Sequence, residues 1–167
     1  QETILSVRNL NKVYETPAAW GRAGTRTHVV HDVSFDIQRG EILGLMGESG
    51  SGKTTIGRLI LQLLHATSGQ VALEGCDLCG MTTQALRPLR ARMQMIFQDP
   101  LFAFNPRHTV HQILGTPLRL HPELVERHGP VDEQIRHVLS QVGLPADVVH
   151  RYPKAFSGGQ RQRIGIA

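Results

Sequence analysis

A glycine-rich stretch between an apolar segment and an amphipathic one constrains this chain most. The pattern G-x-x-x-x-G-K-T begins at Gly47 and ends at Thr54, directly after the apolar residues 42–46. Beyond it, apolar residues recur at helical spacing as far as Leu64. We therefore expect a strand, a tight loop, and a helix over residues 53–64. The strand is apolar on both faces, which is typical of a central strand in a covered sheet.

Each residue type in this loop suits the binding of a phosphate chain. Glycines let the backbone turn tightly and bring its N–H groups against phosphate oxygens. The start of the helix adds the positive end of its dipole. Lys53 is expected to reach the β and γ phosphates as a catalytic residue, Thr54 to bind Mg²⁺, and Thr55 to donate to the α phosphate. The candidate nucleotide-binding residues are Gly47, Ser49, Gly50, Ser51, Gly52, Lys53, Thr54 and Thr55.

Length and composition set broader limits. The chain has 167 residues, of which 40% are hydrophobic and 19% charged, as in an ordinary globular protein. No apolar run approaches the roughly 18 residues of a membrane span, and the start shows no signal-peptide pattern, so we expect a soluble, cytoplasmic chain. The net charge is +4, but the basic residues are spread out, which argues against nucleic acid as a partner. Cys76 and Cys79 lack a second pair at zinc-site spacing, and we interpret them as incidental thiols.

Other patterns predict the remaining elements. Alternating apolar and polar residues predict strands over residues 4–10, 29–37, 70–74 and 93–97. Residues 16–27 are expected to form a loop. Helical patterns occur over 53–64 and near residues 86–92, 110–114 and 131–142, and prolines interrupt the region from residue 99 onward. We expect a mostly helical insert over 99–155 and a last helix from Ser157 through Ala167.

The sequence Ser157-Gly158-Gly159-Gln160 opens that last helix, where a hydroxyl and two glycine amides form a second anion site. With the phosphate loop, it makes the chain resemble the ATPase subunits of ATP-binding-cassette (ABC) transporters, whose signature is usually Leu-Ser-Gly-Gly-Gln. Phe156 replaces the Leu here. The resemblance implies a head-to-tail dimer with a second ATPase subunit, identical or different. Ser157, Gly158, Gly159 and Gln160 would then contact the ATP of the partner.

The resemblance also implies a fold and two more site residues. Gln98 takes the place of the family's Q-loop glutamine, near Mg²⁺ and the attacking water, and Tyr14 takes that of the aromatic residue against adenine. The implied fold class is α/β, a P-loop NTPase core of ABC ATPase type with an antiparallel β subdomain and a helical subdomain. Its domains would be 1–98 for the nucleotide-binding core, 99–155 for the Q-loop and helical subdomain, and 156–167 for the signature and the start of the following helix.

Local motifs narrow the resemblance to importer ATPases for dipeptides, oligopeptides and nickel. The more specific motifs are Asn105-Pro106-Arg107 and Tyr152-Pro153. The implied protein couples MgATP binding and hydrolysis to import of peptides, nickel or similar small solutes. It would lie at the cytoplasmic face of the inner membrane, with membrane permease subunits as partners and, indirectly, a solute-binding protein. The alternatives are a non-transport ABC-type ATPase of a metabolic complex such as carbon-phosphorus lyase, and a module that only binds nucleotide.

The family's hydrolytic residues follow its signature, as an Asp-Glu pair after an apolar strand and a later switch histidine. No acidic residue of this chain follows four consecutive apolar residues, and Glu74, which comes nearest, follows three. Every histidine precedes the signature. The resemblance thus implies a chain that is truncated within the core, without the general base. We expect it to bind nucleotide and to turn over ATP negligibly.

Overall fold

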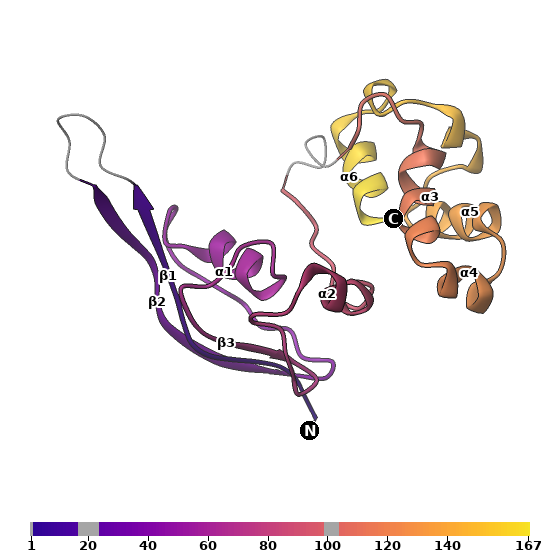
Figure 1. Cartoon of the computed structure of the whole chain (residues 1–167). Coiled ribbons are helices and arrows are strands. Elements are labelled where there is room, and N and C mark those ends of the chain that lie inside the picture. The colour runs from indigo at the N-terminus through magenta and orange to yellow at the C-terminus, as the bar shows by residue number, and fades with distance from the viewer. Residues whose placement is uncertain (1, 17–23, 99–103) are drawn as a thin grey trace. The chain divides into compact units, whose positions relative to one another are not determined.

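The computed structural model of the chain describes residues 2–16, 24–98 and 104–167. It divides into two compact units, Gln1–Gln94 and Met95–Ala167. The first unit carries all the strands of the described residues and two helices, and the second is helical (Figure 1).

The first unit is built on an antiparallel sheet with the strand order β2-β1-β3-β4. Its strands are β1 (Thr3–Thr16), β2 (Thr25–Gln38), β3 (Ser68–Leu73) and the short β4 (Cys76–Asp77). The strands expected over residues 4–10, 29–37 and 70–74 are therefore confirmed. The loop expected over 16–27 is too long, because both long strands extend into it, and its residues 17–23 lie outside the described residues.

The pairing of β1 with β2 is irregular and bends the sheet. The register shifts at several points along the pair. Asn9 and Asp32 have positive φ values of 47° and 45°, and the Asn9 side chain donates to Asp32 Oδ1 at 2.7 Å. Such irregularities increase the local bend and twist of a strand pair. Figure 1 shows the resulting curved ribbon, with α1 (Lys53–Ile60) and α2 (Thr83–Arg90) on the same side of it.

The core of the first unit lies between this sheet and its helices. Val7, Leu10, Val71 and Leu78 pack there with Leu59 of α1, each 0% exposed. The helix expected over 53–64 is one turn too long.

Gln62 ends α1 early. Its φ is 53°, a left-handed conformation that a helix does not continue through, and its buried side chain donates to Leu59 O at 2.9 Å. Helix α2 begins before the expected residue 86, because the Thr82 hydroxyl accepts a hydrogen bond from Ala85 N and caps the helix.

Two of the expected strands are wrong. Residues 42–46 and 93–97 have no strand pairing in the described structure. A buried central strand is stable only when neighbouring strands pair with both of its edges, and the described strands join only the antiparallel sheet. Ile42 and Met46 are consequently 96% and 93% exposed, and Ile96 is 58% exposed.

The second unit is a small helical domain. Its α-helices are α3 (Val110–Leu120), α4 (Pro122–His128), α5 (Val131–Gln141) and α6 (Gly158–Ile166). Helix α4 was not expected, and its proline stands at the first helical position, where no backbone donor is needed. Val110, Ile135, Leu139 and Ile164 form the centre of the core. Among the described residues, no helix is both long and apolar enough to cross a membrane.

Candidate nucleotide-binding site

The loop of residues 47–52 wraps around the ammonium group of Lys53. Nζ of Lys53 donates to Gly47 O at 2.8 Å, to Glu48 O at 2.5 Å and to Ser51 Oγ at 3.1 Å. An ammonium group has three N–H donors, so the loop provides an oxygen for each of them. Binding of a phosphate chain by Lys53 therefore requires an exchange of loop oxygens for ligand oxygens.

Gly50 and Gly52 hold the loop in a conformation that other residues avoid. Their φ values are +84° and +91°, in the left-handed region. A Cβ atom on Gly52 would lie 2.7 Å from the backbone oxygen of Val29 in β2, whereas one on Gly50 would meet nothing within 4 Å. The loop thus packs directly on the backbone of β2. Nothing in the sequence pattern indicated which strand the loop contacts.

Helix α1 begins directly after the loop and leaves its first turn accessible. Ile56 N donates to Gly52 O at 2.9 Å, and neither a capping side chain nor an acidic residue occupies the first turn. The first N–H groups of a helix have no partner within the helix. Thr54, in this turn, is exposed.

These features fit the phosphates of a magnesium nucleotide. A Cβ atom on Gly47 would lie 2.7 Å from Ser51 Oγ and 3.9 Å from Lys53 Nζ, so a side chain there would fill the space that the loop encloses. The loop and helix start offer backbone donors and one ammonium to an anion, and the Thr54 hydroxyl is an oxygen ligand of the kind that Mg²⁺ binds. Ser49 and Thr55 lie in the same stretch, exposed and half-buried respectively.

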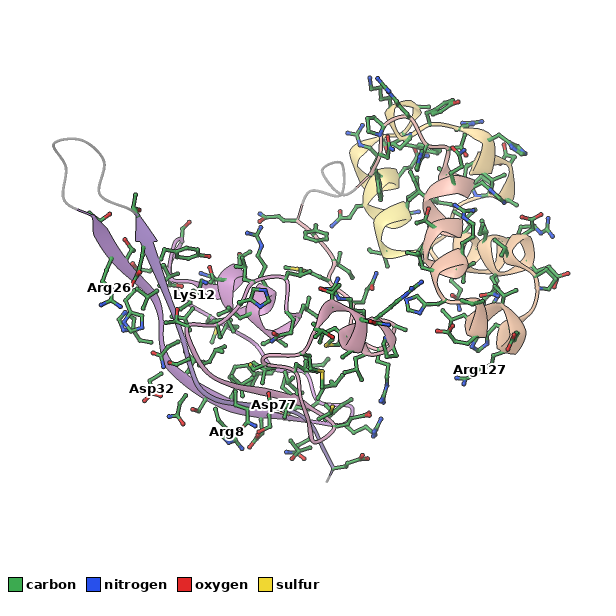
Figure 2. The ribbon with its side chains drawn as sticks, viewed as in Figure 1. Arg8, Lys12, Arg26, Asp32, Asp77 and Arg127 are labelled. Atoms are coloured by element: carbon green, nitrogen blue, oxygen red, sulfur yellow. The ribbon has the colours of Figure 1, made fainter. Side chains whose placement is uncertain are left out.

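Tyr14 lies near the end of β1 with its side chain 41% exposed. The Lys12 ammonium lies over its ring, 5.0 Å from the centroid, and also donates to His65 O at 2.7 Å. Figure 2 shows Lys12 on the side of the sheet that carries α1. Lys12 is not part of any motif in the sequence. Its place two residues before Tyr14 was nevertheless a usable signal, because alternate residues of a strand share a face.

The other side of the sheet carries charged side chains of both signs, among them Arg8 and Asp32 (Figure 2). Arg8 donates to Asp36 at 2.6 Å, and this hydrogen bond lowers the pKa of the Asp36 carboxyl. Mixed charge of this kind is typical of a solvated face and does not select an anion.

A charge network joins the end of β3 to the end of α2. Glu74 forms ion pairs with Arg92 and, at 3.2 Å, with Arg39. The hydrogen bond from Arg92, followed by that from Arg39, lowers the pKa of the Glu74 carboxyl. Because Arg39 also pairs with Glu2 at 2.9 Å, the network fastens the start of β1 as well. The network lies outside the phosphate loop and connects residues at the ends of several elements of the first unit.

The signature residues cap the start of α6. Ser157 Oγ accepts from Gln160 N at 3.3 Å, and the Gln160 side chain accepts from Ser157 N at 3.0 Å. This capping box uses the Ser157 oxygen as acceptor, while its hydroxyl hydrogen can still donate. Ser157, Gly158, Gly159 and Gln160 are all exposed. Phe156, where the family has Leu, is 5% exposed and packs in the same core as Ile164.

The two units divide the candidate residues between them. The phosphate loop and Tyr14 belong to the first unit, and Gln98 and the signature residues belong to the second. Gln98 is exposed, and Asp99 and Pro100, which follow it in the Q-loop motif, lie outside the described residues. Cys76 and Cys79 are free thiols.

Comparison with known proteins identifies the family of the chain. The family model described as "ABC transporter" matches residues 30–167, which include both the phosphate loop and the signature. The chain belongs to the ABC transporter family. Among solved structures, the dimeric ATP-binding cassette MJ0796 bound to ADP and Pi superposes on this ABC-family chain with a TM-score of 0.79. The two sequences are 24% identical, and the aligned region covers 98% of this chain and 67% of the MJ0796 chain. This likeness confirms the expected ABC ATPase fold class.

Two curated relatives have a higher sequence identity to this chain but are longer than it. A Brucella ovis protein, provisionally named a peptide import ATP-binding protein, is 46% identical over 164 residues, with 98% of this chain and 49% of the relative covered. The oligopeptide transport ATP-binding protein OppF of Bacillus subtilis is 42% identical over 167 residues, with 99% and 52% covered. The chain therefore spans about half the length of these curated relatives.

Proposed function

We propose that this chain is the nucleotide-binding part of an ABC-type ATPase that couples MgATP binding and hydrolysis to the import of peptides. The observation that carries the proposal is the Lys53 ammonium group enclosed by its loop at the start of α1. The names of the Brucella and Bacillus relatives support peptides as the solute class. Nickel and similar small solutes remain a broader prediction.

The proposed roles follow the chemistry of each residue. Lys53 binds the β and γ phosphates, the Thr54 hydroxyl binds Mg²⁺, and Tyr14 stacks against the base. Gln98 takes the role of the family's Q-loop glutamine. Bound MgATP supplies the phosphoanhydride bond whose hydrolysis drives transport. The general base is not assigned to a residue of this chain, and we expect this chain by itself to turn over ATP negligibly.

The proposed partners are a second ATPase subunit and membrane permease subunits. Each chain carries one phosphate loop and one signature helix, and the exposed Ser157, Gly158 and Gly159 offer donors to a nucleotide on another subunit. The second unit also has a groove of about 770 Å³ lined in part by His111, Arg136 and Tyr152. With permease subunits as partners, the protein would lie at the cytoplasmic face of the membrane and, indirectly, act with a solute-binding protein.

Nucleotide titration of Lys53→Ala tests the central claim. A hydrogen bond to a charged group contributes about 1.5–3 kcal/mol, so the affinity for MgATP is expected to fall roughly 10- to 150-fold. Lys154→Ala, which removes the same charge from an exposed position in the second unit, is the matched control and leaves the affinity unchanged. Equal affinities of Lys53→Ala and the native chain, measured by isothermal titration calorimetry, would contradict the assignment.

Co-purification separates import from a metabolic scaffold. A tagged protein of this kind is expected to bring down membrane-embedded subunits after detergent extraction. Recovery of soluble enzyme subunits, without membrane proteins, would support a carbon-phosphorus lyase type of complex instead.

A further inference from the structure

We infer that Lys12 is a positioning residue, which holds the Tyr14 ring for base binding and fastens β1 to the segment after α1. The inference rests on the proposed nucleotide function and adds to it a determinant of base recognition. Lys12 is half-buried, and the pattern that defines the phosphate loop does not include it.

One ammonium group makes both contacts. Lys12 Nζ donates to His65 O at 2.7 Å and lies 5.0 Å from the centroid of the Tyr14 ring. A cation within about 6 Å of an aromatic centroid is attracted to the face of the ring. The hydrogen bond to His65 O fixes the ammonium in place, and the ammonium in turn restrains the ring. An aromatic ring has two faces, so a base can still stack on the one that Lys12 does not cover.

Thr67 reinforces the same connection on both sides of Lys12. Thr67 N donates to Asn11 O at 2.9 Å, and the Thr67 hydroxyl accepts from Val13 N at 2.9 Å. The segment that follows α1 is therefore joined to β1 by hydrogen bonds at residues 11, 12 and 13. We call the contacts of Lys12 and Thr67 with this segment and strand the β1–α1 clamp.

The clamp and α1 together fix the position of the Tyr14 ring relative to the phosphate loop. At one end of the helix, Gly52 packs on the backbone of Val29 in β2. Beyond its other end, His65 and Thr67 are held by β1. Both attachments are to the same sheet, so Tyr14 has a set position relative to Lys53 within the first unit. A ligand that uses both sites has to carry a ring and a phosphate chain at a matching separation.

This geometry predicts that Lys12 matters for nucleotides and not for phosphate chains alone. Lys12→Met keeps most of the aliphatic stem and removes the charge. Loss of the cation over Tyr14 is expected to weaken MgATP binding roughly 2- to 30-fold. Binding of magnesium tripolyphosphate, which has no base, is expected to stay within about twofold of the native chain. Lys12→Arg, which keeps a cation, is expected to restore most of the MgATP affinity.

A double-substitution cycle tests whether Lys12 acts through Tyr14. In a Tyr14→Leu background, Lys12→Met is expected to cause no further loss of MgATP affinity, because the ring it positions is gone. Thr67→Val removes the clamp hydroxyl and keeps the side-chain shape. It is expected to cause the same base-dependent loss, and it replaces Lys12→Met in the test if that variant fails to fold by circular dichroism.

Each result has a distinct meaning. Unchanged MgATP affinity in both Lys12→Met and Thr67→Val overturns the inference, as does an equal loss for MgATP and tripolyphosphate, which would mean that Lys12 contacts phosphate directly. Additive losses in the double variant also overturn it. If the native chain binds neither ligand, the proposed nucleotide function itself is wrong.

Discussion

Replacing Gly52 by Ala tests how closely the phosphate loop packs on β2. The new Cβ atom would lie 2.7 Å from Val29 O, and the backbone at this position has a φ of +91°. Holding a non-glycine residue in the left-handed region costs about 1–2 kcal/mol. Displacing the loop or the strand to relieve the close contact costs about 1–3 kcal/mol more. The free energy of unfolding is thus expected to fall by roughly 2–5 kcal/mol.

Gly50→Ala is the matched control for this substitution. Its φ of +84° carries nearly the same conformational cost, but a Cβ atom there would meet nothing within 4 Å. Gly50→Ala is therefore expected to lower the free energy of unfolding only by the cost of the left-handed conformation, about 1–2 kcal/mol. The difference between the two variants measures the contact with Val29.

Urea denaturation followed by far-ultraviolet circular dichroism gives both free energies, provided that the dependence on urea is the same in each variant. Titration with MgATP in parallel is expected to show a larger loss of affinity in Gly52→Ala, because the displaced loop no longer aims its N–H groups at the phosphates. Equal destabilisation of the two variants would refute the packing of the loop on β2.

Two further predictions concern the signature helix and the Glu74 network. Ser157→Ala and Thr109→Ala each remove the hydroxyl of a capping box, so each is expected to lower the free energy of unfolding by about 1 kcal/mol in thermal denaturation. Only Ser157→Ala is expected to weaken ATP-dependent association of two subunits in sedimentation experiments, and equal weakening by both would refute its role at a partner. Glu74→Gln is expected to lower the urea midpoint at pH 7. The hydrogen bond from Arg92 lowers the pKa of Glu74, so the native chain is expected to be more stable than Glu74→Gln above the ordinary pKa of 4.5. This difference in stability is expected to disappear as the pH falls through the lowered pKa. A difference that grows on acidification would contradict this sign.

Local patterns predicted the antiparallel strands and most of the helices. Alternation within β1, β2 and β3 is a property of consecutive residues, and so is the hydroxyl that caps α6. Residues 42–46 have an equally clear apolar pattern, yet they form no strand here. Whether these residues form a strand depends on pairing with neighbouring strands, and a local pattern carries no information about that pairing.

The candidate site was predictable to a similar extent. The loop around Lys53 follows from the spacing of residues within one short stretch. The contacts that position the loop and Lys12 do not follow from local spacing. They join Gly52 to Val29 and Lys12 to His65, which are far apart in the sequence. Even the clear motif therefore left open which strand supports the loop, and which cation accompanies Tyr14.

The three oxygens around Lys53 also make the resting loop selective among anions. A chloride ion offers a single contact, so it can replace no more than part of the shell that the ammonium already has. A polyphosphate offers many oxygens on one chain and can replace the shell as a set. The Lys53 ammonium is accordingly expected to exchange its loop oxygens more readily for a polyphosphate than for a halide ion.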